Sequence, residues 1–328
     1  MSRILATFAG LLICCGMQAQ CHGEKVTLRV MTFNLYHGGV RLGQPLSQSV
    51  KAIKAARADI VGIQESHAGS VDNAEQIAER LGWHHFAQGG RTAVISRFPI
   101  VGNTPGKWGV HLKLSSGLIV HVFNAHLHYI PYQPYQLAEI PYGDFPFIKT
   151  EQEAITWAVR ARGAQKDRLL AELRPSLEAR IPCFLTGDFN EPSFQDWTKS
   201  VAATGRIPLK VEYPATKAIV DAGMLDGYRV GYPDPVKSPG WTWTPTTQPT
   251  DPRDRHDRID FVFSSLEPKS VKSAAVVGEA AKSAEIVLKP WPSDHRAVVV
   301  EYEFNAQSSI CLLYTSDAAD EGLGVDLG

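Results

Sequence analysis

The chain has 328 residues, with 33 Lys and Arg against 34 Asp and Glu and a formal net charge of −1. This length allows one large α/β domain or two small ones, and a hydrophobic share of 44% is that of an ordinary globular protein. Proteins that grip long nucleic acids usually carry a basic excess. The balanced charge therefore disfavours a clamp for a long polyanion but leaves small phosphoesters open as substrates.

The N-terminal segment has the pattern of an export signal. Arg3 precedes an apolar run from Ile4 to Cys15, and small and polar residues follow. The run is too short to span a bilayer comfortably, so we predict a secretory signal peptide over residues 1–23. The mature protein would then be secreted or periplasmic. A lipid anchor on a cysteine of this segment is the minor alternative, because no convincing run of small residues precedes any of them.

Strands and helices alternate in the first half of the remaining chain. The stretch KVTLRVMTFN predicts a buried strand ending at Asn34, and ADIVGIQE predicts a second strand with Glu65 at its C-terminal end. Helical spacing occurs over 46–57 and over 71–83, where Gly82 closes the helix. Further strands are predicted within 91–100 and 106–128, with a hairpin turn at 115–117.

The second half begins with a long predicted helix over 150–179, which Pro175 kinks or ends. A buried strand follows in IPCFLTGDFN, then a helix and a short strand within 214–229, and two late strands in RIDFVFSS and HRAVVVEYEF. Strands occur in hairpins, and helices lie between pairs of them. This order predicts an α/β fold in which two sheets pack face to face with helices outside.

The stretch 232–258 is rich in Pro, Thr and charged residues and runs directly into a predicted strand. We interpret it as a long surface loop, not as a domain boundary. Arg255 and Arg258 within it could contact phosphate. Asp254 and Asp257 could equally neutralise them in a surface salt-bridge run, which is the commoner case.

Residues 307–328 follow the last predicted strand and show no periodicity, and CLLYTSDAADE resembles translated sequencing-adapter sequence. We interpret this stretch as an artefactual tail, with a genuine disordered tail as the alternative. One domain over 24–306 is therefore expected. Its single cysteine, Cys183, leaves the domain without an intrachain disulfide and is expected to be a small buried residue.

Polar residues recur at the ends of the predicted strands, where sites are commonly built. Each has an ordinary structural explanation. Asp188 and Asn190 in FLTGDFNEPS, two apart and expected to face the same way, are common turn formers. Asp260 is harder to explain, because a carboxylate inside a strand is costly to bury unpaired. As a set, these residues predict one site: Asn34, Glu65, His126, Asp188, Asn190, Asp260, Asp294 and His295.

The residue types of this set indicate the chemistry. Carboxylates and amides with few histidines suit a hard cation such as Mg²⁺, whereas zinc prefers clustered His or Cys. A histidine with a carboxylate partner can deprotonate water. The set therefore favours metal-assisted hydrolysis of a phosphoester.

Seven motifs occur along the chain in the order MTFNLYHGG, DIVGIQE, VISRFPI, FNAHLH, LTGDFNEP, DRIDFVF and SDHRAV. In this order they resemble the endonuclease/exonuclease/phosphatase family, the deoxyribonuclease I-like metal-dependent phosphoesterases. The resemblance runs from about Leu28 to Phe304. It implies a four-layer α/β/β/α sandwich of two packed mixed sheets with outer helices.

The resemblance also implies a metal site. Glu65 would be the main ligand of Mg²⁺, for which Mn²⁺ could substitute. Asn34 would lie beside Glu65, and Asp294 would add a further contact to the cation.

The remaining residues of the set would then act on the reaction itself. The resemblance implies that His295 is the general base, oriented by Asp260, and that it activates the attacking water. Asp188 and Asn190 would position that water and the phosphate. His126 would stabilise negative charge on the phosphate.

We therefore predict a secreted, Mg²⁺-dependent phosphodiesterase of nucleic acids or nucleotides, monomeric and without an obligatory protein partner. One alternative is a phosphoesterase for phospholipid or sugar-phosphate headgroups, and another is a non-catalytic binding module on the same fold. His128 has no clear counterpart in the family and is expected to lie at the rim or in the core. The aromatic, Pro-rich segment 129–149 is either a lid on the substrate side or a loop packed on its own side chains.

Overall fold

The computed structural model describes residues 25–248, 250–251 and 253–306. The signal peptide and tail expected at the two ends lie outside these residues. The large sheets contain β1 (Lys25–Asn34), β2 (Ile60–Gln64), β5 (His84–Gly89), β6 (Thr92–Ser96), β7 (Ile100–Asn103), β8 (Gly109–Lys113), β9 (Ile119–His126), β10 (Cys183–Asp188), β11 (Leu225–Asp226), β12 (Asp260–Ser264), β13 (Val271–Gly278), β14 (Ile286–Val287) and β15 (Ala297–Asn305).

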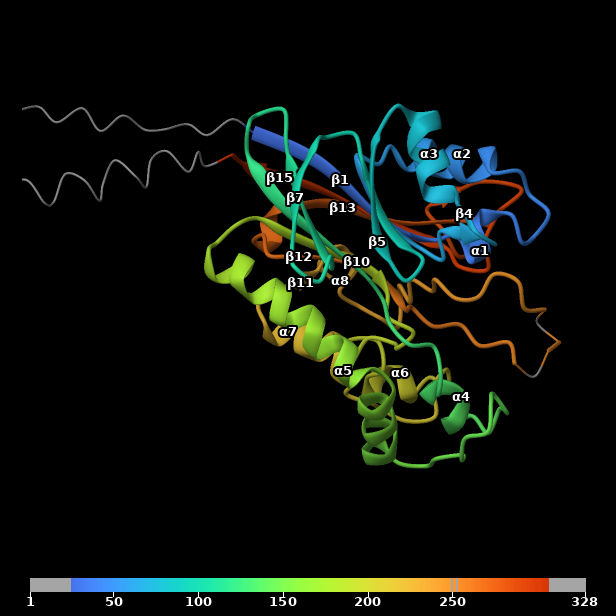
Figure 1. Cartoon of the computed structure of the whole chain (residues 1–328). Coiled ribbons are helices and arrows are strands. Elements are labelled where there is room, and N and C mark those ends of the chain that lie inside the picture. Colours follow the sequence, from blue (N-terminus) through green and yellow to red (C-terminus); the bar gives the residue numbers. More distant parts are fainter. Residues whose placement is uncertain (1–24, 249, 252, 307–328) are drawn as a thin grey trace, which may run out of the picture.

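The helices occur between groups of these strands along the chain (Figure 1). They are α1 (Tyr36–Gly39), α2 (Ser47–Ala56), α3 (Asn73–Leu81), α4 (Gln133–Leu137), α5 (Glu151–Glu178), α6 (Lys199–Ala202), α7 (Pro214–Asp221), α8 (Gly227–Gly231) and the 3₁₀ turn η1 (Pro268–Ser270). A small hairpin of β3 (His67–Ala68) and β4 (Val71–Asp72) precedes α3. None of the helices in the described part of the chain is long and apolar enough to cross a membrane.

The two large sheets are both mixed. One has the strand order β14-β13-β15-β1-β2-β6-β5, and the other has the order β11-β12-β10-β9-β8-β7. In the first sheet β1 pairs parallel with β2 and antiparallel with β15. In the second sheet β10 pairs parallel with β9 and antiparallel with β12. Figure 1 shows α2 and α3 outside one sheet and α5 and α7 outside the other.

Three buried apolar clusters separate the molecule into four layers. The first packs Ile53 of α2 and Ile77 of α3 against the seven-stranded sheet. The second lies between the two sheets and includes Val30. The third packs Leu169 of α5 and Ile219 of α7 against the six-stranded sheet. Because each layer buries apolar side chains against the next, the architecture is the expected α/β/β/α sandwich.

A polar network crosses the middle of the core between the sheets. The Gln64 amide donates to Thr32 Oγ1 at 3.1 Å and to Asn124 Oδ1 at 2.6 Å, and Thr186 Oγ1 donates to the same Asn124 oxygen at 3.0 Å. Gly62 permits this close approach, because a Cβ there would lie 1.8 Å from Thr186 Oγ1. Buried polar groups with partners on both sheets fix how the sheets sit on each other.

The long helix predicted over 150–179 is confirmed as α5, which continues past Pro175 to Glu178. The expectation that 232–258 is a surface loop is wrong in part, because Thr242, Asp257 and Arg258 within it are buried. Strand β13, with exposed Lys272 and Ser273 among its apolar residues, was not predicted from the sequence.

Candidate active site

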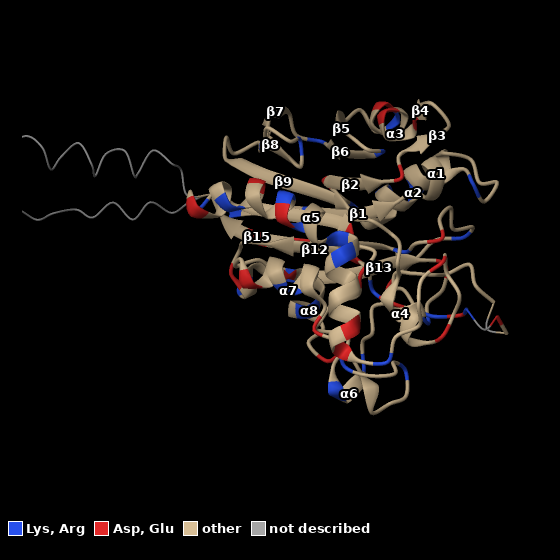
Figure 2. Ribbon diagram, turned by 60° about the horizontal axis from the view of Figure 1, so that its bottom comes forward, with Lys and Arg blue, Asp and Glu red and all other residues tan. Residues whose placement is uncertain are grey.

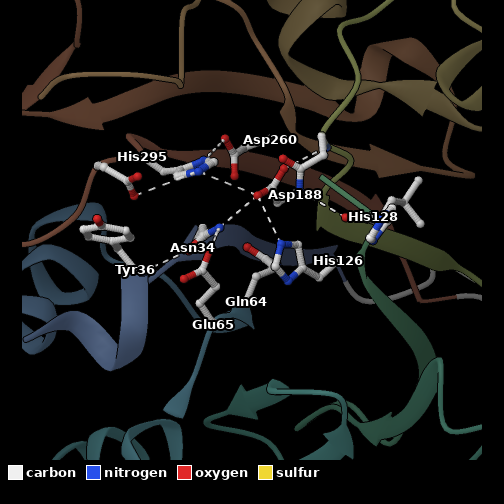
Figure 3. Close-up of polar contacts among 12 residues, drawn as sticks. Asn34, Tyr36, Gln64, Glu65, His126, His128, Asp188, Asp260 and His295 are labelled. Atoms are coloured by element: carbon white, nitrogen blue, oxygen red, sulfur yellow. Dashed lines mark hydrogen bonds and ion pairs between the residues drawn. The ribbon is translucent and has the colours of Figure 1, made fainter. Parts of the chain in front are cut away.

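Strand pairing brings three of the predicted residues to one edge of the sandwich, and a hydrogen bond from the facing sheet adds a fourth. Asp188 at the end of β10 pairs with His126 at the end of β9 on one side and with Asp260 at the start of β12 on the other. In the facing sheet, β1 ends at Asn34, whose side-chain amide donates to Asp188 Oδ2 at 2.8 Å. The dashed lines that meet at Asp188 in Figure 3 show this convergence. Asp188 therefore links the two sheets at the candidate site.

His295 lies just before β15 and is fixed by its surroundings. Its backbone N–H donates to Ser293 Oγ at 3.1 Å, and Ser293 in turn donates to the backbone oxygen of Asn34 at 2.7 Å. The backbone oxygen of His295 accepts from Trp291 Nε1 at 2.7 Å. These bonds fix the turn of residues 291–295 to the end of β1 and so hold the imidazole of His295 in the site.

The imidazole of His295 contacts carboxylates through both nitrogens. Nδ1 lies 2.9 Å from Asp260 Oδ2, and Nε2 lies 3.7 Å from Asp188 Oδ2 and 4.0 Å from Asp294 Oδ1 (Figure 3). Burial alone would lower the pKa of His295, but the three carboxylates outweigh burial and raise this pKa well above its usual range. The arrangement is that of a histidine held for proton transfer, with one nitrogen fixed by a carboxylate.

Glu65 follows β2 in the left-handed region, with φ of 51°, and its carboxylate turns back toward Asn34. Asn34 Nδ2 donates to Glu65 Oε1 at 3.3 Å, and the backbone N–H of His37 donates to Glu65 Oε2 at 3.1 Å. Burial would raise the pKa of Glu65. The charges of His295 and His126 and the bond from His37 outweigh burial and lower it, so the carboxylate stays ionised.

The turn that binds Glu65 is unusual. Its residues Tyr36, His37, Gly38 and Gly39 all have positive φ, so the segment labelled α1 is a left-handed turn. Non-glycine residues adopt such values at a cost that surrounding contacts must offset, and such residues cluster at functional sites. His37 was not predicted as a site residue, although its ring nitrogen Nε2 lies 3.9 Å from Glu65 Oε2. The signal in sequence was the Gly pair that follows it.

Asp294 and Glu65 are the carboxylates that fit a cation best. Oδ1 of Asp294 is buried and has no hydrogen-bond partner among the described residues. Burial, together with the charges of Glu65 and Asp188, raises the pKa of Asp294 to about 6. A buried carboxylate oxygen that has no hydrogen-bond partner and lies near other carboxylates is a suitable ligand for a hard cation. The amide oxygen of Asn34, beside Glu65, accepts from the backbone N–H of Tyr36 at 2.9 Å.

Asp188, Asp260 and His295 form a second group whose potential ligand atoms lie within 4.8 Å of one another. In this group the imidazole already holds Asp260 through Nδ1, and Asn34 holds Asp188. Each of the three residues therefore already has a partner inside or beside the group, although Asp260 Oδ1 has none among the described residues. For this reason the group suits proton transfer better than metal binding, and the all-oxygen set of Glu65 and Asp294 suits the cation better.

Asp188 and Asn190 also form a turn. Asp188 Oδ1 accepts from the backbone N–H of Asn190 at 2.8 Å, and Asn190 has a φ of 47°. The two residues do not share one face of a strand, as their spacing suggested, because β10 ends at Asp188 and Asn190 lies in the turn that follows. The side chain of Asn190 instead donates to the backbone oxygen of Leu127 at 3.0 Å and so links the exits of β9 and β10.

The two histidines of FNAHLH have different surroundings. Nε2 of His126 lies 3.6 Å from Asp188 Oδ2 inside the site. His128 is exposed, and its ring packs on Tyr129 with centroids 5.3 Å apart. The structure thus places His128 at the rim, as expected from sequence.

Arg258 is not a phosphate contact, and neither expectation for it holds. Its side chain is buried, with Nε 2.9 Å from Asp196 Oδ2 and Nη1 2.7 Å from Asp226 Oδ2. Asp257 is also buried, and its carboxylate accepts from Tyr132 and Trp197. These pairs hold the chain that leads into Asp260, so their role is structural.

A buried arginine that sequence reasoning missed connects the exits of the site strands. Arg162 of α5 donates from Nε to Glu191 Oε2 at 3.0 Å and from Nη1 to the backbone oxygens of His128 and Pro131 at 3.1 and 3.2 Å. It also donates to the side chain of Gln133. One guanidinium therefore fixes the chain after His126 and the chain after Asn190.

Comparison with known proteins agrees with this geometry. The family model described as the endonuclease/exonuclease/phosphatase family matches residues 31–295, which is most of the chain. The chain belongs to the endonuclease/exonuclease/phosphatase family. Members of this family share a phosphoesterase fold, and the sequence resemblance to it is confirmed.

Individual relatives are more distant. An uncharacterised protein of Caenorhabditis elegans is 28% identical over 303 residues, which cover 84% of this chain and 91% of that protein. A 3′ phosphatase from Neisseria bound to a product DNA hairpin covers 84% of this chain and 100% of its own, at 17% identity and a TM-score of 0.54. An AP endonuclease from Archaeoglobus fulgidus covers 84% and 99%, at 17% identity and a TM-score of 0.52. At these identities the two solved structures show a shared fold.

Proposed function

We propose that this protein is a divalent-metal-dependent phosphodiesterase in which His295 activates a water molecule for in-line attack on phosphorus. The observation that carries the proposal is the position of His295. Its Nδ1 is fixed 2.9 Å from Asp260, and its Nε2 faces the buried carboxylate of Asp188 at 3.7 Å. A histidine oriented through one nitrogen leaves the other to accept a proton from water.

The chain's own residues account for each step of the proposed reaction. His295 Nε2 takes the proton of the attacking water while the water oxygen bonds to phosphorus and the bond to the leaving oxygen breaks. Asp260 holds the Nδ1 proton and stabilises the imidazolium that forms. Asp188, with Asn190 fixing its turn, positions the water. His126 donates to a phosphate oxygen, on which negative charge develops.

Glu65 and Asp294 would hold the cation, with Asn34 orienting Glu65. Bound Mg²⁺ or Mn²⁺ would offset phosphate charge and, by neutralising these carboxylates, would lower the pKa of His295 toward the range of a base. The fit rests on the partnerless oxygen of Asp294 and on the ionised state of Glu65.

Release of p-nitrophenol from bis-p-nitrophenyl phosphate tests the activity. The proposal predicts turnover with Mg²⁺ or Mn²⁺ that stops when EDTA is added and returns when excess metal is restored. A protein that binds Mg²⁺ but releases no p-nitrophenol from this ester or from a panel of other phosphodiesters would instead be the non-catalytic binding module.

For the substrate, we propose phosphodiesters of nucleic acids or nucleotides. The product DNA hairpin bound to the Neisseria phosphatase supports this class through the shared fold alone. Lys and Arg are interspersed with Asp and Glu over the ribbon in Figure 2, which favours short or single-stranded substrates over a long duplex. A phospholipid headgroup is the second candidate, because exposed tyrosines lie near the site.

We also propose that the protein is exported and acts as a monomer. The apolar run at 4–15 supports export, and cell fractionation with an antibody would test it. Recovery of the mature protein in the cytoplasm would contradict export, and a dimer in light scattering would contradict the monomer.

A further inference from the structure

The segment 129–149, which follows β9, divides its aromatic residues between two environments. Tyr132 and Tyr135 are buried. The hydroxyl of Tyr132 donates to Asp257 Oδ2 at 2.7 Å, and that of Tyr135 donates to the backbone oxygen of Arg253 at 3.2 Å. These two residues anchor the segment on the chain that leads into β12. The segment therefore has a fixed base.

The outer aromatic residues are exposed instead. Tyr129 retains 50% and Tyr142 retains 39% of their accessible surface, and their ring centroids lie 6.2 Å apart. Large exposed aromatic side chains gathered on a rigid base commonly mark a binding surface. Burial of the inner tyrosines explains the fold of the segment, but it does not explain why these two rings face solvent.

A continuous series of ring contacts joins the exposed pair to the candidate base. The centroid separations are 6.5 Å for His295–Trp243, 5.7 Å for Trp243–Tyr135 and 5.5 Å for Tyr135–Tyr142. The site carboxylates also act on Tyr142. Burial is the main cause that raises the pKa of Tyr142, and the charges of Asp294, Glu65 and Asp188 add to it. Tyr142 is thus connected to His295 through the two intervening rings of Tyr135 and Trp243, and Tyr129 packs against Tyr142.

We propose that Tyr129 and Tyr142 form a platform on which the nucleobase of the nucleotide next to the scissile phosphate stacks. The inference rests on the proposed function and names the part of the substrate that this chain recognises. Stacking on an aromatic face needs no positive charge and accepts any base, because every base has a π-face.

Charge and ring geometry favour a base over the other occupants. The segment carries Glu139, Asp144 and Lys149, and Lys149 Nζ lies 3.7 Å from Glu139 Oε1, so no basic excess is present to hold an anionic lipid surface. A quaternary ammonium is best held where several ring faces surround it. Tyr129 and Tyr142 meet edge to face, at an interplanar angle of 71°, so their faces do not oppose each other as two walls of such a cage.

Three substrates that release the same p-nitrophenol test this assignment. They are p-nitrophenyl thymidine 5′-phosphate, methyl p-nitrophenyl phosphate and p-nitrophenylphosphorylcholine, which differ only in the second ester arm. We expect the ratio of kcat/KM for the thymidine ester to that for the methyl ester to fall about 10- to 100-fold in the Tyr129→Ala/Tyr142→Ala variant. The Tyr129→Phe/Tyr142→Phe variant keeps both rings and should retain the ratio of the wild-type protein.

Phe147→Ala is the matched control. Phe147 is 47% exposed in the same segment, and it makes no ring contact among the residues that the structure describes. Its loss should leave the ratio unchanged. The platform would be overturned if the double alanine variant kept the wild-type ratio of kcat/KM for the thymidine ester to that for the methyl ester. It would also be overturned if the wild-type protein preferred the choline ester and lost this preference in the double alanine variant. If the wild-type protein hydrolyses none of the three esters, the proposed function is overturned instead.

Discussion

At the scale of single residues, the site concentrates negative charge. Glu65, Asp188, Asp260 and Asp294 all surround His295, either through direct contacts or through their charges. Mutual repulsion among carboxylates destabilises a site unless positive charge is present. The imidazolium of His295 supplies one such charge. Asp294 Oδ1 has no hydrogen-bond partner in the described part of the chain, so this oxygen could bind a second positive charge, that of a metal ion.

Metal binding can therefore be tested without an activity assay. We predict that Mg²⁺ raises the Tm of the wild-type protein, because a ligand that binds only the folded state stabilises it, by about 2.7 kcal/mol at one hundred times its Kd. The shift should disappear in Glu65→Gln and in Asp294→Asn. Differential scanning calorimetry with and without Mg²⁺ gives the measurement.

The control for this experiment is Glu75→Gln, which removes a carboxylate that is exposed on α3. It should keep the full Mg²⁺ shift. Equal shifts in Asp294→Asn, Glu65→Gln and the control would show that the cation binds elsewhere, and the ligand assignment would be wrong.

At the scale of elements, the ends of β1, β2, β9, β10 and β12 create the site. The sequence allowed these ends to be predicted, because apolar runs stop at Asn34, Glu65, His126 and Asp188. Sequence reasoning placed Asp260 inside an apolar run, and the structure places it opposite Asp188 at the start of β12. The strand ends were predictable because hydrophobic patterning marks where a buried strand leaves the core.

The residues that position these ends could not be predicted in the same way. Arg162 reaches Glu191, and Arg258 reaches Asp196 and Asp226, through pairings between residues far apart in the chain. A charged residue on a long helix is usually exposed, so nothing local to Arg162 indicated burial. The left-handed turn at His37 likewise depends on its contact with Glu65, which only the packed sheets provide.

Arg162 should act as a positioning residue. We predict that Arg162→Ala lowers kcat on bis-p-nitrophenyl phosphate about 10-fold or more, because the exits of β9 and β10 lose their shared anchor. It should also cost about 3–5 kcal/mol of stability, since buried Glu191 is left unpaired. Added guanidinium at millimolar concentration should restore part of kcat, and steady-state kinetics with and without it provide the measurement.

Arg160→Ala is the comparison variant, because Arg160 is exposed on the same helix and lies over the ring of Trp157. It should change neither kcat nor the response to guanidinium. If Arg162→Ala loses stability but keeps the kcat of the wild-type protein, Arg162 supports the fold without positioning the site.

At the scale of the whole molecule, the sandwich buries titratable groups far from the site. His121 of β9 pairs with His111 of β8, and their rings stack with centroids 3.8 Å apart. His121 is buried, and its Nδ1 lies 2.8 Å from Ser176 Oγ on α5. Burial, followed by the charge of His111, lowers the pKa of His121 to about 4.

The contribution of His121 to stability should consequently fall with acid. In the unfolded chain His121 titrates near the ordinary value of 6.5, so the unfolded state binds the extra proton first as the pH falls. This contribution is constant above about pH 7 and decreases between about pH 6.5 and 4, by up to about 3 kcal/mol. Urea unfolding at several pH values measures this decrease.

His121→Asn, which keeps a polar atom near Nδ1, should show a smaller decrease over the same pH range. His84→Asn, at an exposed histidine, should behave like the wild-type protein. If His121→Asn loses as much stability in acid as the wild-type protein, other groups cause the pH dependence.

We propose His295 as the base of a metal-dependent hydrolase. The most direct test is to measure kcat on bis-p-nitrophenyl phosphate at saturating Mg²⁺ for the His295→Gln and His128→Gln variants. The account predicts a loss of about 10²- to 10⁴-fold for His295→Gln, because general base catalysis contributes about that factor, and a change of less than about 3-fold for rim residue His128. A His295→Gln variant that keeps the wild-type kcat while remaining folded would contradict the account.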